Sequence, residues 1–214
     1  MTTDTTQTRT SAEMWFDPTC PWAWMTSRWL IEAAQVRELD ITWSVMSLAV
    51  LNEGRDLDED YREMMDRAWA PVRVIMAAAR EQENDAAAGA VRKALYDAMG
   101  TRIHAQGRGT DDLQAVIAES LAEAGLSPTL AHAADDDAMD VELRASHQRA
   151  IDLVGDEVGT PVVAVQGVAF FGPVVTPAPK GEAAGRLWDG CVLVAGTPGF
   201  YELKRTRDAD PDFG

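Results

Sequence analysis

Cysteine and histidine are scarce in this 214-residue chain, which has two cysteines, Cys20 and Cys191, and three histidines. Two cysteines cannot form a disulfide scaffold, and their wide separation gives no metal-ligand spacing, so we expect no zinc site. No apolar run reaches the roughly 20 residues of a membrane span, and the polar, threonine-rich start lacks the apolar core of a secretory signal. We therefore expect a cytoplasmic protein in a reducing compartment.

Basic residues are also few, since 19 Lys and Arg stand against 35 Asp and Glu, which gives a formal net charge of −16. Contacts to phosphate need clustered Lys and Arg, so this charge argues against binding to nucleic acid or to an anionic membrane. The basic run at 203–207 is too short to reverse that expectation. No glycine-rich phosphate loop follows the first predicted strand, so the sequence offers no flavin or nicotinamide site.

The hydrophobic pattern predicts a β-α-β unit within the first 50 residues. The apolar run at 14–16 ends at Asp17-Pro18, which is typical of a buried strand that enters a turn. Pro21 suits the first position of a helix, because proline has no N–H to leave unpaired there. Residues 41–48 alternate apolar and polar side chains, which indicates a second strand.

The remaining sequence predicts a helical block followed by a second β-rich half. Residues 55–154 are rich in alanine and acidic side chains, and Gly155 stands where a helix usually stops. Two β-rich runs then flank a Gln166-Gly167 turn, which predicts a hairpin, and residues 181–195 carry an apolar helical stripe. The predicted organisation has a first α/β half at 12–54, a helical insertion domain at 55–154, a second α/β half at 155–207, and flexible tails at 1–11 and 208–214.

Cys20 stands where the first predicted strand, a turn and a helix meet. Unpaired N–H groups and the helix dipole at a helix N-terminus stabilise a thiolate, so this position predicts a lowered pKa and a nucleophilic sulfur. An aromatic ring close to such a nucleophile can stack on a substrate or line a pocket. The candidates for the walls of a substrate site are the neighbours Pro21 and Trp22 and, after the second strand, Asn52 and Tyr61.

An ordered set of motifs resembles one protein family. The chain has CPW at the first helix and GTP before the third strand, within the stretches FDPTCPWAW, SRWLIEAA, MSLAVLNEGRD, YREMMDRAWAPVRV, YDAMGTRIHAQG, DEVGTPVVAVQGVAFFGPV and FYELKRTR. These stretches resemble the DsbA-like branch of the thioredoxin superfamily and, within it, the mycothiol-dependent nitroreductases. The resemblance implies an α/β thioredoxin-like fold with a large all-helical insertion between the β-α-β and β-β-α halves.

The resemblance also implies the chemistry of the site. Members of the family carry the motif CPWC, whose first cysteine attacks a disulfide or accepts mycothiol and whose second cysteine resolves the mixed disulfide. Cys20 matches the first cysteine, whereas Ala23 stands at the position of the second. Thr160 and Pro161 match a loop whose proline, cis in the fold, faces the catalytic cysteine. Mycothiol is then the expected co-substrate, no cofactor is tightly bound, and the substrates are disulfides or electrophilic nitroaromatic compounds.

Several alternatives stay open at this point. Ala23 fits a natural monothiol cycle, in which a second small thiol or a redoxin regenerates Cys20, and it fits equally an engineered replacement of the resolving cysteine. A glutathione-transferase kappa or isomerase-like enzyme, which activates a thiol without redox change, is a second candidate function. A non-catalytic peptide-binding module is a third. The sequence does not decide between a monomer and a homodimer.

Overall fold

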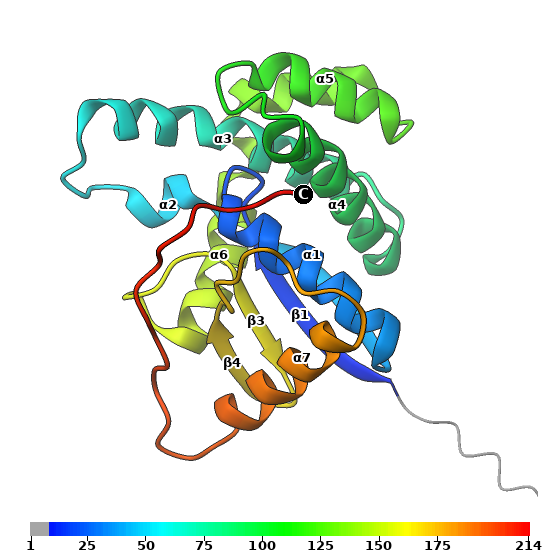
Figure 1. Cartoon of the computed structure of the whole chain (residues 1–214). Helices are drawn as coiled ribbons and strands as arrows, with labels where there is room; N and C mark the ends of the chain where they lie inside the picture. The colour runs from blue at the N-terminus through cyan, green and yellow to red at the C-terminus, as the bar shows by residue number, and fades with distance from the viewer. Residues whose placement is uncertain (1–8) are drawn as a thin grey trace, which may run out of the picture.

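Four strands form one mixed sheet in the computed structural model, which describes residues 9–214 (Figure 1). The strand order is β2-β1-β3-β4. β1 (Thr10–Phe16) pairs in parallel with β2 (Leu39–Val45) and antiparallel with β3 (Val162–Val165), which forms a hairpin with β4 (Val168–Phe171). Strands from residues 10–45 and 162–171, which are far apart in sequence, therefore build a single sheet.

The second strand lies slightly earlier than the predicted range 41–48. It ends at Val45 because the chain then enters the short helix α2 (Leu48–Asn52). Ser47 is the N-cap of this helix, and its side-chain oxygen accepts a hydrogen bond from Val50 N at 3.3 Å. The cap satisfies a backbone N–H that the first turn of a helix leaves without an intrahelical partner.

The hairpin between β3 and β4 turns at Gln166-Gly167, as the sequence predicts. Its two central residues, Gln166 and Gly167, both have positive φ, at 51° and 82°. Positive φ at both positions is the geometry of the two-residue turn that matches the twist of paired strands. The prediction of a hairpin is confirmed.

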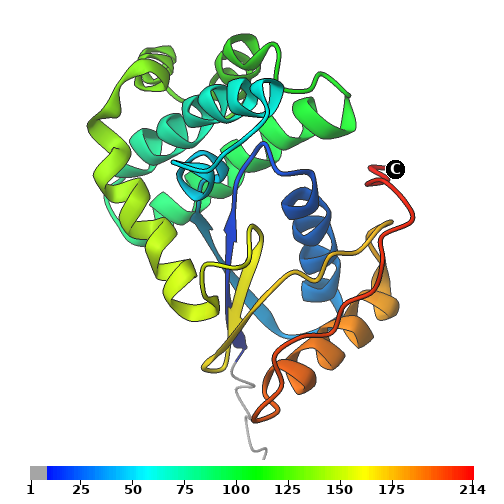
Figure 2. The same cartoon turned by 90° about the vertical axis from the view of Figure 1, so that its left-hand side faces the viewer.

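Helices cover both faces of the sheet. α1 (Pro21–Val36) and α7 (Gly181–Ala195) lie together on one face, and α6 (Asp140–Val154) lies on the other (Figures 1 and 2). The buried ring of Trp29 in α1 donates from Nε1 to Ala184 O in α7 at 3.1 Å. This contact joins the two helices through residues that are 155 positions apart in the sequence.

The other helices gather beyond one end of the sheet, above it in Figure 1. They are α2, α3 (Glu59–Arg80), α4 (Asp85–Gly100), the π-helix η1 (Thr101–Ala105), α5 (Leu113–Glu123), and the 3₁₀ helices η2 (Pro128–Asp135) and η3 (Asp137–Met139). They follow β2 in the chain and lead into α6, which ends at Gly155 as the sequence predicts. Among residues 9–214, no helix is both long and apolar enough to cross a membrane.

The last residues of the chain make defined contacts, although the sequence predicts a flexible tail at 208–214. Phe213 is half-buried against the hydrophobic core, and Asp212 N donates to Thr176 Oγ1 at 2.7 Å. At the other end, the predicted tail at 1–11 lies mostly outside the described residues, and β1 already begins at Thr10. The C-terminal segment therefore returns from α7 to the start of α1 (Figure 1).

Candidate active site at the start of α1

The turn between β1 and α1 presents Cys20 at a helix N-terminus. Asp17 O accepts a hydrogen bond from Cys20 N at 3.1 Å, and Pro18 occupies the second position of this turn, which suits its fixed φ. Cys20 is the N-cap of α1, and its Sγ accepts a hydrogen bond from Ala23 N at 3.4 Å. Pro21 takes the first helical position, as predicted.

Burial changes the expected chemistry of Cys20, a residue that is only 5% exposed. Loss of water raises the pKa of the Cys20 thiol to about 12, while the hydrogen bond from Ala23 N lowers it and the charge of Asp17 raises it. The expectation of a lowered pKa is wrong for this arrangement, because desolvation outweighs the effect of the helix N-terminus. A thiolate at neutral pH requires that Cys20 gain access to water or substrate.

The loop before β3 lies against the sulfur of Cys20. Cys20 Sγ donates to Thr160 O at 3.5 Å, and the Thr160–Pro161 peptide bond is cis. Thr160 is 4% exposed, and its Oγ1 has no hydrogen-bond partner within residues 9–214. The structure thus brings together Cys20 and the loop that the resemblance placed opposite it, across 140 positions of sequence.

The neighbours of Cys20 on α1 differ in exposure. Pro21 and Trp22 are half-buried, whereas Ala23 is fully buried, one helical turn from the Cys20 sulfur. The guanidinium of Arg207, from the C-terminal segment, lies 5.3 Å from the centre of the Trp22 ring. Trp22 is therefore partly open, as expected, but a cation of the same chain occupies part of its face.

Asn52 and Tyr61 lie after β2, in α2 and α3. Asn52, at the end of α2, donates from Nδ2 to Leu48 O at 2.9 Å. Tyr61 is half-buried in the first turns of α3, and its pKa is raised, first by burial and then by the charge of Cys20. Tyr61 packs against the cluster of Ala49, Met65 and Ala68.

The sequence did not single out His104 for this site. Its Nε2 lies 2.9 Å from Pro18 O, and because a carbonyl only accepts hydrogen bonds, Nε2 carries the proton of the neutral ring. The ring centre lies 5.8 Å from that of Trp24 and 5.4 Å from that of Phe213. His104 lies in the π-helix η1 and is 7% exposed.

Acidification is expected to destabilise the protein through His104. Burial lowers the pKa of His104 to about 4, so the unfolded state takes up a proton near pH 6.5 and the folded state only near pH 4. The free energy of unfolding therefore falls through this window, by about 2 kcal/mol at pH 5 for this group. Urea unfolding at pH 7 and pH 5 measures the fall. His104→Gln keeps an N–H donor for Pro18 but has no titrating ring, so its free energy of unfolding should fall less between pH 7 and pH 5. If that free energy falls as far in the variant as in the wild type, His104 is not a neutral buried ring.

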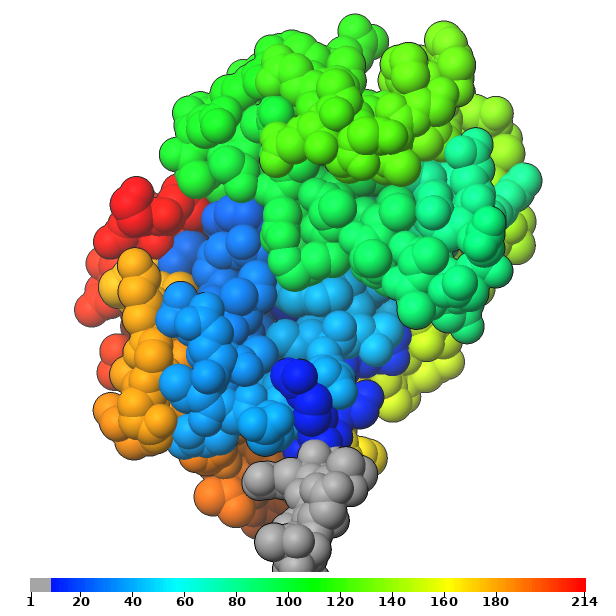
Figure 3. Space-filling model, turned by 90° about the vertical axis from the view of Figure 1, so that its right-hand side faces the viewer, coloured from blue at the N-terminus to red at the C-terminus, as the bar shows by residue number. Residues whose placement is uncertain are grey.

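The C-terminal segment lies beside the candidate site. Phe213 contacts the ring of His104, and Arg207 contacts that of Trp22. Figure 3 shows the red C-terminal residues against the blue start of α1 and next to the green helices of the insertion. The site is therefore bordered by three parts of the chain: the α1 turn, the helical insertion and the final residues.

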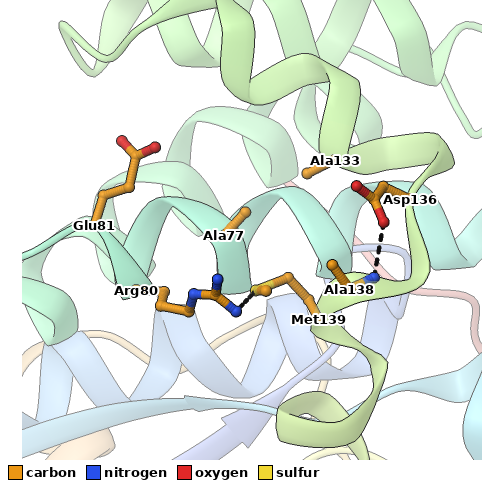
Figure 4. Close-up of a pocket in the computed structure, with 7 residues that line it drawn as sticks. All are labelled: Ala77, Arg80, Glu81, Ala133, Asp136, Ala138 and Met139. Atoms are coloured by element: carbon orange, nitrogen blue, oxygen red, sulfur yellow. Dashed lines mark hydrogen bonds between the residues drawn. The ribbon is translucent and has the colours of Figure 1, made fainter.

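Two cavities of the structure lie elsewhere. One of about 240 Å³ is lined by Ala77, Arg80, Glu81, Ala133, Asp136, Ala138 and Met139 (Figure 4). It is smaller than the roughly 300 Å³ at which small-molecule sites begin, and Asp136 is already bonded to Ala138 N at 2.9 Å. The second, of about 560 Å³, lies between Arg37, Trp188 and Leu193, beyond the start of β1. In the described chain, no group of three or more His, Cys, Asp or Glu side chains could hold a metal ion.

The structure has the thioredoxin-like α/β fold with a large helical insertion that the sequence predicts. The structure resembles that of the probable DsbA oxidoreductase SCO1869 from Streptomyces coelicolor, with a TM-score of 0.54, 20% identity, and coverage of 94% of this chain and 95% of that chain. It also resembles the cytosolic disulfide reductase DsbM from Pseudomonas aeruginosa with GSH, with a TM-score of 0.54, 15% identity, and coverage of 86% and 99%. A 2-hydroxychromene-2-carboxylate isomerase has a TM-score of 0.51, with 17% identity and coverage of 86% and 93%. At these identities the likeness is one of fold.

The chain belongs to the Rv2466c-like family, described as mycothiol-dependent nitroreductase Rv2466c, whose sequence model matches residues 19–205. It is also 29% identical over 199 residues to the uncharacterized protein Rv2286c of Mycobacterium tuberculosis, a match that covers 92% of this chain and 83% of that protein. Fold and family are those of thiol-disulfide oxidoreductases and nitroreductase-like enzymes.

Proposed function

We propose that this protein is a mycothiol-dependent oxidoreductase that reduces disulfides or nitroaromatic compounds through Cys20. The observation that carries the proposal is the position of the Cys20 sulfur, 3.5 Å from Thr160 O in a cis-proline loop and capping the first turn of α1. Membership of the Rv2466c-like family supports mycothiol as the co-substrate. The DsbM structure of the same fold, which contains glutathione, supports a low-molecular-weight thiol as partner.

In the proposed reaction with a disulfide, the Cys20 thiolate attacks one sulfur of the substrate. A mixed disulfide forms, the original S–S bond breaks, and the departing thiolate takes up the proton that Cys20 lost. A first mycothiol then displaces the remaining half of the substrate and becomes joined to Cys20. A second mycothiol attacks this bond, leaves as oxidised mycothiol and restores Cys20. Ala23 carries no thiol, so every release step uses an external one.

The surrounding residues take complementary roles in this proposal. Thr160 and Pro161 present backbone groups to the substrate, and Thr160 Oγ1, which has no partner in the described chain, is free to bond to it. Pro21 and Trp22 form the apolar wall, while Asn52 and Tyr61 supply polar groups from the opposite side. Because burial raises the pKa of Cys20, approach of the substrate has to coincide with exposure of the sulfur.

Intact-protein mass spectrometry after incubation with oxidised mycothiol tests the proposal. We expect one mycothiol adduct on the wild-type chain and none on Cys20→Ser, because the other cysteine, Cys191, is a half-buried helical residue whose pKa burial raises to about 11. The adduct should disappear when reduced mycothiol is added, since the release step needs only an external thiol.

Three results would count against it. Full thiol-dependent activity of Cys20→Ser would exclude Cys20 as nucleophile. A stable thioether product without thiol oxidation would favour the isomerase or transferase function, whose fold this chain shares. Peptide binding that survives alkylation of Cys20, with no adduct, would favour a binding module.

A further inference from the structure

One buried carboxylate connects the turn that carries Cys20 with the helical insertion. Asp17 is 0% exposed. Its Oδ1 accepts hydrogen bonds from Thr19 N at 2.8 Å and Thr19 Oγ1 at 2.7 Å, and its Oδ2 accepts one from Leu48 N at 2.7 Å. Burial raises the pKa of Asp17, while these hydrogen bonds lower it. Both carboxylate oxygens accept hydrogen bonds, and their donors belong to two segments. Thr19 lies in the turn before Cys20, and Leu48 follows Asp17 by 31 positions.

The first oxygen fixes the turn before the nucleophile. The bond from Thr19 N to the Asp17 side chain forms an Asx-turn, and Asp17 O accepts from Cys20 N at 3.1 Å. The hydroxyl of Thr19 adds a third bond to the same residue. Since Thr19 directly precedes Cys20, these three hydrogen bonds fix the position of Cys20 at the N-terminus of α1.

The second oxygen fixes the start of α2. Leu48 is the first residue of this helix and donates from its N–H to Asp17. The carbonyl of Leu48 accepts a hydrogen bond from the side chain of Asn52, one helical turn later. Asp17 is therefore connected through Leu48 to Asn52. Without Asp17, Leu48 N would lose its partner in a partly buried place, which is costly for a backbone N–H. The same carboxylate therefore sets the positions of Cys20 and of Asn52 relative to each other.

We propose that Asp17 is a positioning residue that holds the nucleophile Cys20 and the α2 wall of the substrate site in one arrangement. The proposal rests on the proposed function of Cys20. Asp17 acts through the Cys20 turn and through Leu48, and it does not contact the reacting atoms. Its role differs from that of an ordinary structural residue because its negative charge also opposes a thiolate at Cys20.

Other titratable groups face this pair from four elements. They are Tyr61 on α3, Tyr96 on α4, His104 on η1 and His147 on α6. Both tyrosines have raised pKa values, above all from burial, and both histidines have pKa values lowered to about 4, again from burial. At neutral pH these four groups carry no charge, whereas Asp17 accepts hydrogen bonds from three donors, a pattern that favours its carboxylate form.

Asp17→Asn tests the proposal with two rates. The amide has a similar shape but no charge and one acceptor oxygen, so it cannot accept from both Thr19 and Leu48. The first rate is alkylation of Cys20 by iodoacetamide as a function of pH, and the second is exchange of Cys20 with oxidised mycothiol. We expect the alkylation midpoint to move down by about one pH unit. The exchange rate, corrected for the thiolate fraction, should fall about tenfold, because the site is misaligned.

Two further variants separate position from charge. Thr19→Val removes the Oγ1 donor but keeps the carboxylate, so the corrected exchange rate should fall about threefold without a downward shift of the alkylation midpoint. Asp136→Asn is the matched control. Asp136 is exposed, caps Ala138 N at 2.9 Å in the insertion, and should leave both rates unchanged.

An unchanged corrected exchange rate in both Asp17→Asn and Thr19→Val would overturn the proposal. A second result would also overturn it: the alkylation and exchange rates of Asp17→Asn fall only in proportion to a lower melting temperature, while both rates of Thr19→Val equal those of the wild type. If the wild-type chain itself does not exchange with oxidised mycothiol, the proposed function fails instead. The alkylation rate, corrected for the thiolate fraction, then still decides: a rate changed in both Asp17→Asn and Thr19→Val supports the role of Asp17 at Cys20, and a rate unchanged in both overturns it.

Discussion

Ala23→Cys is expected to speed the release of mycothiol from Cys20 by at least about a hundredfold, because it converts an intermolecular step into an intramolecular one. The backbone N of residue 23 lies 3.4 Å from the Cys20 sulfur, so a thiol at this position is one helical turn from the mixed disulfide. A time course of intact mass, after free thiol is removed, measures the release. The product should be a disulfide between Cys20 and the introduced cysteine, lighter than the reduced variant by two hydrogen atoms.

Ala23→Ser is the control for this experiment. Serine has the same shape as cysteine with a smaller oxygen in place of sulfur, and it also adds a polar group at this fully buried position, but it cannot attack a disulfide. The adduct should therefore persist in Ala23→Ser as long as in the wild-type chain. Equal persistence in Ala23→Cys would mean that this position does not face the Cys20 sulfur, and the comparison with the two-cysteine motif would fail.

Gly100→Ala is expected to have the largest effect on stability among the glycine substitutions. A Cβ at Gly100 would lie 2.3 Å from two atoms of the Trp24 ring, which is far inside a normal contact. The ring has little room to move, because Arg28 lies 3.9 Å over one face and Tyr96 packs edge-on at 5.7 Å. Overpacking of a core costs about 1–3 kcal/mol, and we expect a loss at or above the upper value. Urea unfolding measures it.

Gly89→Ala provides a matched control in the same helix, α4. The nearest atom to a Cβ at Gly89 is 4.0 Å away, so the added methyl group meets no clash. Alanine in a helix is favoured over glycine by roughly 0.5–1 kcal/mol, so this variant should be slightly more stable than wild type. If Gly100→Ala and Gly89→Ala change the free energy of unfolding by the same amount and in the same direction, α4 does not pack on Trp24 as described.

The parts of the fold that the sequence predicts well are those with local causes. The Gln166-Gly167 turn predicts the hairpin because both residues tolerate positive φ. Pro21 marks the start of α1, and Gly155, with φ of 86°, marks the end of α6. The end of β2 is less well predicted. The alternation typical of a strand continues through residue 48, but in the structure Ser47 already caps α2 through its bond with Val50 N.

The candidate site is only partly visible in the sequence. Cys20 could be found from the strand, turn and helix around it, but its burial depends on the distant Thr160–Pro161 loop and on packing that no local pattern reports. The same holds for the pKa of Cys20: its place at a helix N-terminus predicts a lowered value, whereas burial raises it. The burial of His104 is not visible either, because the π-helical turn that carries it has no clear sequence signal.

Asp17 shows a different limit of sequence reasoning. The Asp17-Pro18 pair correctly predicts a turn, and an aspartate at the start of a turn normally bonds to the backbone two residues later. The second bond, to Leu48 N, depends on the neighbouring strand β2 and on where it ends. A residue with an adequate local explanation thus has a long-range contact that only the assembled structure reveals.

The course of the C-terminal segment decides where an affinity tag or reporter can be fused. Phe213 lies on His104 and Arg207 on Trp22, so anything joined after Gly214 is delivered to the mouth of the candidate site. The start of β1 is at the other end of the strand, about 23 Å away for its seven residues. A fusion ahead of Thr10 is joined at the far end of β1, whereas a C-terminal tag is joined beside the candidate site, so thiol exchange should be compared between the two tagged forms.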